Sequence, residues 1–117
     1  MLPSKHRLLR SRDFKRVYHQ GKRVRGKLLQ ICWAPNRASL TRFGFSISKK
    51  IGKAVERNLL KRRLREICRQ HLGLFLPGLD VVVVAQEGSG KADFLTLKEE
   101  IMELGKKAGI IEETEDA

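Results

Sequence analysis

The stretch Ser48–Glu66, SKKIGKAVERNLLKRRLRE, carries the strongest pattern in the sequence: eight of its residues are Lys or Arg and two are Glu. Its apolar residues recur at helical spacing and predict a helix over residues 55–71. At 100° per residue, one side of this helix is expected to face a core: Leu60, Leu64, Ile67, Cys68 and His71. The opposite side collects polar and cationic residues: Asn58, Lys61, Arg62, Arg65 and Arg69.

The cationic side of this helix is not explained by folding. Like charges four residues apart, as at Lys61, Arg65 and Arg69, oppose helix formation by about 0.2–0.5 kcal/mol per pair. Glu66 offers compensation only to Arg62, and a merely solvated helix face normally mixes both signs of charge. We therefore interpret this side as a binding surface for a polyanion, of which phosphate is the commonest in a cell.

The charge of the whole chain is divided unevenly along its 117 residues. Residues 1–70 contain 21 Lys or Arg and 3 Asp or Glu, for a net charge of +18, whereas residues 71–117 contain 4 and 10, for −6. The length suits one domain. We assign residues 1–108 to this domain and residues 109–117, which end in EETEDA, to a flexible acidic tail.

Compartment signals in the sequence favour the cytoplasm. No apolar run approaches the roughly 18 residues that a membrane-spanning helix needs, and the N-terminus lacks the apolar core of a signal peptide. Cys32 and Cys68 fit no metal-ligand spacing and are expected to be reduced thiols in the core. The sequence indicates neither membrane binding nor a protein partner.

The remaining patterns predict the order α-β-β-α-β-α. A helix is expected over residues 12–20, strands over 27–35, 42–48 and 80–85, and a last helix with the apolar stripe Phe94, Leu97, Ile101 and Leu104. A further strand fits within residues 22–34. These elements predict an α+β fold, a single-domain sandwich in which helices pack against a small central sheet.

Nucleic acid is the polyanion that the side chains favour. Lys49, Lys50 and Lys53 precede the N-terminus of the basic helix, where backbone N–H groups attract anions. Arginine offers a planar fork to phosphate, and Asn58 can reach a base edge or a 2′-hydroxyl. Among the aromatic residues, Phe14 and Tyr18 share a helix face and Trp33 lies on the first strand, so that stacking with unpaired bases is possible.

No catalytic residue is predicted in this chain. Metal-dependent cleavage of phosphodiesters uses clustered carboxylates, but the cationic portion has only Asp13, Glu56 and Glu66. Its histidines are scattered, and no metal site is assigned.

Three stretches resemble the bacterial ribonuclease P protein subunit. The longest is FGFSISKKIGKAVERNLLKRRLRE, residues 43–66, with an Arg-Asn-x-x-Lys-Arg-x-x-Arg core at residues 57–65. RDFKRVYHQG at residues 12–21 is similar to the first helix of that family, and GLDVVVVA at residues 78–85 is similar to its last strand. The resemblance covers the chain to about residue 108.

The resemblance implies a fold with a left-handed βαβ crossover and a role in which a large RNA is the catalyst. That RNA removes the 5′ leader of precursor tRNA with magnesium, so magnesium is expected to act through the catalytic RNA. When the family's contacts are carried over residue by residue, the resemblance implies that the following residues contact the catalytic RNA: Lys49, Lys50, Lys53, Arg57, Asn58, Lys61, Arg62, Arg65 and Arg69. The cleft for the single-stranded leader is implied for Phe14, Tyr18 and either Cys32 or its neighbour Trp33.

Two other functions remain open at this point. A nuclease made of protein alone would cleave RNA without an RNA partner. A general RNA chaperone or ribosome-associated protein would bind RNA by charge, with no preference for precursor over mature tRNA.

Overall fold

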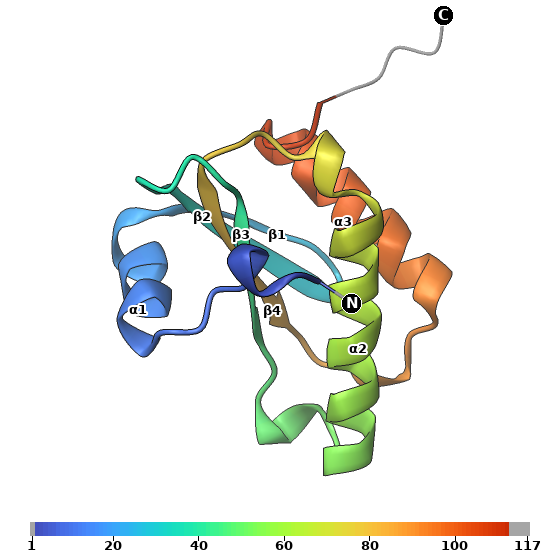
Figure 1. Cartoon of the computed structure of the whole chain (residues 1–117). Coiled ribbons are helices and arrows are strands. Elements are labelled where there is room, and N and C mark those ends of the chain that lie inside the picture. Colours follow the sequence, from blue (N-terminus) through green and yellow to red (C-terminus); the bar gives the residue numbers. More distant parts are fainter. Residues whose placement is uncertain (1, 113–117) are drawn as a thin grey trace, which may run out of the picture.

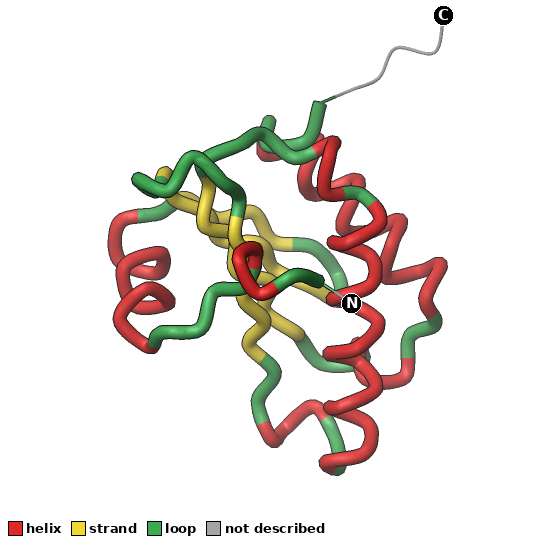
Figure 2. Tube along the Cα trace, viewed as in Figure 1, coloured by secondary structure: helices red, strands yellow, loops and turns green. Residues whose placement is uncertain are grey.

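The computed structural model describes residues 2–112, which form three α-helices and one four-stranded sheet (Figures 1 and 2). The helices are α1 (Ser11–Gln20), α2 (Ala54–Gln70) and α3 (Phe94–Ala108), and the strands are β1 (Lys22–Arg25), β2 (Leu29–Pro35), β3 (Arg42–Ser46) and β4 (Leu79–Ala85). Short 3₁₀ helices lie between them: η1 (Ser4–His6), η2 (Lys49–Ile51), η3 (Leu72–Leu74) and η4 (Ser89–Lys91). The predicted α+β class and element order are confirmed, and β1 is the further strand.

The sheet has the strand order β1-β2-β4-β3. β2 is antiparallel to both β1 and β4, whereas β3 is parallel to β4. α2 connects these two parallel neighbours and so forms the βαβ unit that the resemblance implies; the left hand of its crossover stays an implication of the resemblance. β4 therefore lies in the middle of the sheet, which explains its run of four valines.

Helices cover both faces of the sheet, as the cartoon shows (Figure 1). On one face, α2 and α3 bury a large core with side chains such as Ile31, Phe43, Val81 and Val83. On the other face, the shorter α1 covers a small cluster. That cluster contains Leu8, Val17, Cys32, Ala34 and Val82, with Phe14 and Tyr18 at its margin.

The helical periodicity of α2 correctly identifies its buried side. Leu60, Leu64, Ile67 and Cys68 are all inaccessible to solvent, whereas His71 lies just beyond the last helical residue and is only half-buried. The stripe of α3 is likewise confirmed at Leu97, Ile101 and Leu104. Both cysteines are free thiols in the core.

The domain extends beyond the predicted boundary at residue 108. Ile110 and Ile111 are buried, and Ile111 forms a β-bridge with Phe75. The backbone N–H of Leu76 donates to the carbonyl of Ile110, and that of Glu112 donates to the carbonyl of Leu74. Ile110 and Ile111 therefore belong to the core, and residues 113–117 of the predicted tail lie outside the described residues.

Candidate nucleic-acid interface

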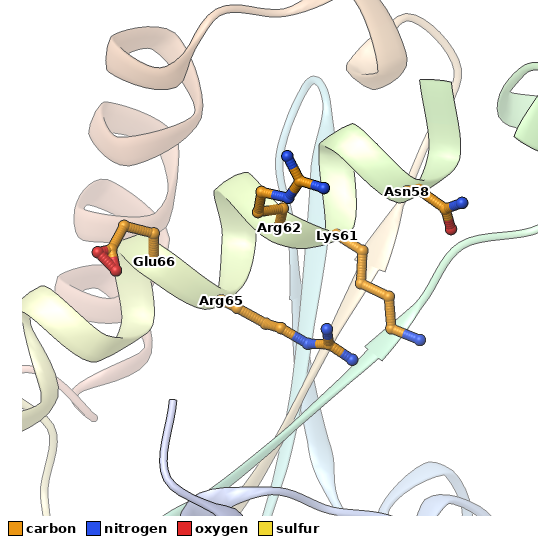
Figure 3. A pocket seen from close by; sticks show the side chains of 5 residues that line it. All are labelled: Asn58, Lys61, Arg62, Arg65 and Glu66. Carbon is orange, nitrogen blue, oxygen red and sulfur yellow. The ribbon is translucent and has the colours of Figure 1, made fainter. Parts of the chain in front are cut away.

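The exposed side of α2 is the surface on which the sequence predicts RNA contacts. We call it the α2 surface and define it by Arg57, Asn58, Lys61, Arg62 and Arg65. Lys61 and Arg65 extend from the helix next to each other, while Glu66 points in another direction (Figure 3). These two cations and Asn58, Arg62 and Glu66 line a hollow of about 650 Å³.

The cations of the α2 surface have no counter-ion among residues 2–112. Within residues 2–112, none of the five α2-surface side chains makes a hydrogen bond or an ion pair. Glu66 instead accepts from Arg69 at 2.6 Å, and these hydrogen bonds lower the pKa of Glu66 and raise that of Arg69. Arg69 is thus the predicted contact whose charge is already compensated, so the others are better placed for an external anion.

The N-terminus of α2 adds three exposed lysines to the α2 surface. Lys49 and Lys50 belong to η2, and Lys53 is the N-cap residue. Glu56 accepts from the backbone N–H of Lys53 at 3.2 Å and so satisfies one of the N–H groups near the helix end. The structure therefore brings all the predicted catalytic-RNA contacts to one helix and the turn before it.

Arg57 has an unsatisfied polar atom beside the α2 surface. Its Nε is buried and has no hydrogen-bond partner among the described residues. Arg57 also lines a hollow of about 140 Å³ with Phe45, Ile47, Asn58 and Lys61. A donor that is shielded from water and unpaired favours an external acceptor, because leaving it unpaired costs free energy.

A third hollow joins the α2 surface to α1. It has a volume of about 190 Å³, and its lining includes Lys61 and Arg65 from α2, Gly44 from β3 and Phe14 from α1. Gly44 lets the Phe14 ring approach β3 closely, because a Cβ atom at this position would lie 2.5 Å from that ring. The ring that the sequence places in the leader cleft is therefore next to the cations that it assigns to the catalytic RNA.

The predicted cleft residues other than Trp33 gather where α1 packs on the sheet: Phe14 and Tyr18 from α1 and Cys32 from β2. Phe14 and Tyr18 are half-buried at the margin of the small cluster, and Cys32 lies beneath them at 1% exposure. Cys32 can support these rings but offers almost no surface of its own to a ligand. Trp33 points to the opposite face, where it packs against the large core. Of the two alternatives, Cys32 therefore lies on the face that α1 covers and Trp33 on the opposite face.

Two arginines of β1 lie on the face of the sheet that α1 covers, and the sequence analysis did not single them out. Arg23 pairs with Cys32 and Arg25 with Gln30, which places both arginines on the side of α1. Arg23 donates to the carbonyl of Tyr18 at 3.5 Å, and Arg25 donates to Gln86 at 2.7 Å. The alternation Arg-Val-Arg at residues 23–25 could have predicted this placement. Val24 packs against the large core, so its two neighbours on the strand point to the opposite face.

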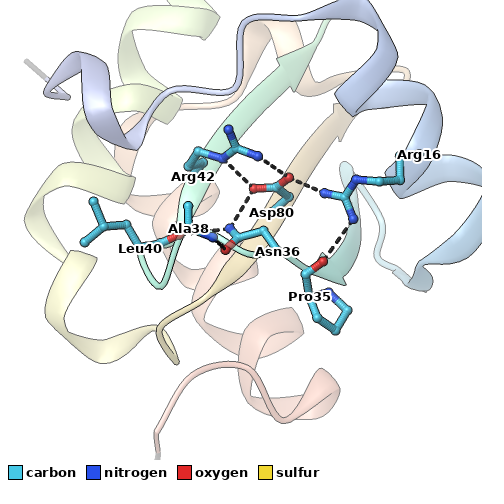
Figure 4. Close-up of polar contacts among 7 residues, drawn as sticks. All are labelled: Arg16, Pro35, Asn36, Ala38, Leu40, Arg42 and Asp80. Carbon is cyan, nitrogen blue, oxygen red and sulfur yellow. Dashed lines mark hydrogen bonds and ion pairs between the residues drawn. The ribbon is translucent and has the colours of Figure 1, made fainter.

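The buried carboxylate of Asp80, at the N-terminal end of β4, connects α1 and β3 to the sheet (Figure 4). We call Arg16, Asn36, Arg42 and Asp80 the Asp80 cluster. Asp80 is 0% exposed and accepts two hydrogen bonds of 2.8 Å from Arg42, one of 2.8 Å from Asn36 and one from Arg16. Burial alone would raise the pKa of Asp80, but these hydrogen bonds and both guanidinium charges outweigh it and lower the pKa.

The described residues offer no metal centre. No three His, Cys, Asp or Glu side chains within residues 2–112 lie close enough together to hold a metal ion. Burial raises the pKa of the Cys68 thiol, which keeps it protonated. None of the helices in this part of the chain has the length and apolar character to cross a membrane.

A one-sided cationic helix on a small mixed sheet, with aromatic rings at its border, defines an RNA-binding α+β domain. A sequence model of the family Ribonuclease P matches residues 2–109. The chain therefore belongs to the ribonuclease P protein family.

Relatives in this family match nearly the whole chain. The ribonuclease P protein components of Syntrophomonas wolfei and Caldanaerobacter subterraneus are 41% and 44% identical to it, over 94% and 93% of this chain and 92% and 94% of theirs. The RNase P protein of Staphylococcus aureus, a solved structure, has a TM-score of 0.85 at 29% identity, over 92% of this chain and 98% of that one. The RNase P protein of Thermotoga maritima has a TM-score of 0.79 at 32% identity, over 86% and 96%.

Proposed function

We propose that this chain is the RNA-binding protein subunit of a ribonuclease P ribonucleoprotein and works in the cytoplasm. Its α2 surface binds the catalytic RNA, and the sheet face beside α1 binds the single-stranded 5′ leader of precursor tRNA. The catalytic centre lies in the RNA partner, which also holds the magnesium that cleavage requires. The chain itself contributes binding, orientation and charge compensation.

The observation that carries this proposal is the set of unpaired cations on α2. Four positive charges, those of Arg57, Lys61, Arg62 and Arg65, have no internal counter-ion among the described residues. A polyphosphate backbone supplies the missing negative charge and releases its own bound counter-ions, which drives binding. Family membership identifies which RNA is the natural candidate.

The leader site is supported by the hollow that Phe14 shares with Lys61 and Arg65. A single strand that crosses this boundary can place phosphates on the cations and bases against Phe14 and Tyr18. Arg23 and Arg25 on β1 provide cations on the same face of the sheet. Stacking on exposed rings contributes about 1–3 kcal/mol per base.

The decisive experiment is cleavage of precursor tRNA at low magnesium concentration. The protein alone, the catalytic RNA alone and the two together are compared, with substrates that carry or lack a leader. Activity that requires the RNA, and that the protein increases mainly for leader-bearing substrates, is the expected result. Cleavage by the protein alone would instead identify a nuclease made of protein.

A triple variant tests the α2 surface. Replacement of Arg57, Arg62 and Arg65 by Ala is expected to weaken binding to the catalytic RNA by roughly 10- to 100-fold, because three phosphate contacts are lost. Replacement of Lys91, Lys106 and Lys107 by Ala removes the same charge elsewhere and serves as the control. Equal affinity of the two variants would exclude the α2 surface as the RNA site.

Tyr18→Ala tests the leader site separately. The loss of one ring is expected to reduce the preference for leader-bearing over leaderless substrate by roughly 5-fold or more, since stacking supplies about 1–3 kcal/mol. Binding of the catalytic RNA should not change. If Tyr18→Ala keeps the full preference for leader-bearing substrate, the leader does not bind beside α1. If the wild-type protein shows no such preference, it acts as a general RNA chaperone.

A further inference from the structure

A second concentration of arginine surrounds Arg42, at the start of β3. Two hollows, of about 440 Å³ and about 330 Å³, meet at this residue, which lines both. We call the arginines that line them the arginine surface: Arg7, Arg10, Arg12, Arg16, Arg37 and Arg42. They come from the segment before α1, from α1, from the β2–β3 loop and from β3.

The arginine surface has an excess of positive charge. Its six guanidinium groups face two carboxylates, those of Asp13 in one hollow and of Asp80 beneath Arg42. A formal excess of four positive charges is left. Arg10, Arg12 and Arg37 are exposed, and within residues 2–112 their side chains make no hydrogen bond or ion pair.

The arginines at the centre of this surface are held in place before any ligand binds. Asp80 accepts from both Arg16 and Arg42, and Arg16 also donates to the Pro35 carbonyl at 2.9 Å (Figure 4). Yet their side chains remain 29% and 27% exposed. Ordered cations lose little side-chain entropy when they bind an anion, which favours binding.

The composition of the arginine surface favours phosphate over bases. All six cations are arginines, whose planar forks match phosphate oxygens. No aromatic residue lines either hollow, so the stacking that holds unpaired bases has no platform here. This chemistry fits the sugar–phosphate backbone of a folded RNA better than a single strand.

The arginine surface is continuous with the α2 surface. Arg7 and Leu9 line the hollow of about 330 Å³ and also the hollow that contains Lys61 and Arg65. The cations therefore form one band from α2, around the segment before α1, to Arg37 in the β2–β3 loop. α2 and Arg37 lie at opposite ends of this band.

We propose that the arginine surface is a second phosphate-binding surface, which holds the backbone of a folded RNA at a point separate from the α2 surface. The identity of this RNA as the catalytic RNA of ribonuclease P rests on the proposed function. The binding of phosphate backbone by these arginines does not.

The test compares two triple variants of the full chain. Arg10, Arg12 and Arg37 are replaced by Gln, which leaves the Asp80 cluster intact, and Lys91, Lys106 and Lys107 are replaced by Gln as the charge-matched control. Binding to ribonuclease P RNA and to an RNA duplex of unrelated sequence is measured over a range of salt concentrations. Circular dichroism and thermal unfolding establish that both variants are folded.

The arginine variant is expected to bind ribonuclease P RNA about tenfold or more weakly than the control, with a salt slope smaller in magnitude by about 2–3. Affinity and salt slope equal to those of the control, on both RNAs, would overturn the proposal. A separate outcome concerns the proposed function: if the wild type does not prefer ribonuclease P RNA to the duplex, that function fails. The loss in the arginine variant on the duplex would still support the second surface.

Discussion

The cations of the α2 surface and the arginines of the Asp80 cluster are similar groups in opposite electrostatic settings. Arg62 and Arg65 project from one helix with no counter-ion among the described residues, and their charge is available to a ligand. Arg16 and Arg42 share a fully buried carboxylate that belongs to β4. The difference shows that the setting of an arginine in this protein depends on its partner. The first pair is unpaired among the described residues, whereas the second pair holds α1 and β3 to the sheet and leaves only about a quarter of its side-chain surface open to a ligand.

The largest expected effect is the salt dependence of RNA binding by the unpaired cations of the α2 surface. If RNA binding neutralises about six phosphates, log affinity should fall against log salt with a slope near −5. Affinity should then drop about 10³-fold between roughly 50 and 200 mM salt. Binding of catalytic RNA measured across this range tests it, and a flat response would contradict the electrostatic origin of binding.

Asp80→Ala should have the largest effect on stability. Loss of the carboxylate leaves two arginines and Asn36 without their shared acceptor, and we expect the free energy of unfolding to fall by about 2–4 kcal/mol. This is below the cost for a fully buried pair, because both arginines are partly exposed. Urea denaturation measures the change.

The control for this variant is Glu99→Ala, which removes an exposed carboxylate on α3. Its effect should stay within about 0.5 kcal/mol. Similar losses in the two variants would mean that the Asp80 cluster does not hold the fold together.

Acid should weaken the same cluster. The pKa of Asp80 is lowered in the folded state, so its contribution to stability is present above the ordinary value of 3.8 and is lost as the pH falls through the folded pKa. The effect is smaller than that of Asp80→Ala, because a protonated carboxyl group still accepts a hydrogen bond. Unfolding of wild type and Asp80→Asn is compared between about pH 5 and about pH 3. Parallel pH dependence of the two proteins would exclude this contribution.

The smallest expected effect separates charge from geometry on α2. Replacement of Arg62 and Arg65 by Lys keeps both charges but removes the planar forks, and affinity for the catalytic RNA should fall by about threefold to tenfold. The salt slope should stay the same. Arg69→Lys, at a residue already paired with Glu66, should change the affinity little. Unchanged affinity in the double variant would show that α2 acts through charge alone.

Local patterns in the sequence were sufficient for the α2 surface. A helix imposes its own period, so the positions of Leu60 and Leu64 determine which side is buried and hence where Lys61 and Arg65 point. The same reasoning placed Phe14 and Tyr18 on one side of α1. These predictions depend on residues within a few helical turns of one another.

The residues predicted for the leader cleft could be assigned to a face of the sheet only from the tertiary structure. Adjacent strand residues point to opposite faces, but the sequence does not say which face α1 covers. Only the packed structure places Cys32 under α1 and Trp33 against the large core on the other face. It also brings Arg23 and Arg25 to the face that α1 covers, because β1 pairs with β2 in one particular register.

The end of the domain was misjudged from composition. Acidic residues after Gly109 suggested a tail, although the apolar pair Ile110 and Ile111 precedes all of them. These two residues lie against Phe75 and Leu76, which are more than thirty positions away in sequence. A contact between residues so far apart in sequence produces no periodic pattern of apolar residues around either of them, so it could not be predicted from the sequence.

Periodicity and charge along the chain therefore determined the class of fold, the basic helix and the nature of its ligand. The Asp80 cluster, the faces of β2 and the continuity of the arginine surface depended on tertiary structure. The physical reason is the range of the interactions involved. Helical amphipathicity arises between neighbours in sequence, whereas Arg16, Asn36, Arg42 and Asp80 come together only when α1, the β2–β3 loop, β3 and β4 have packed.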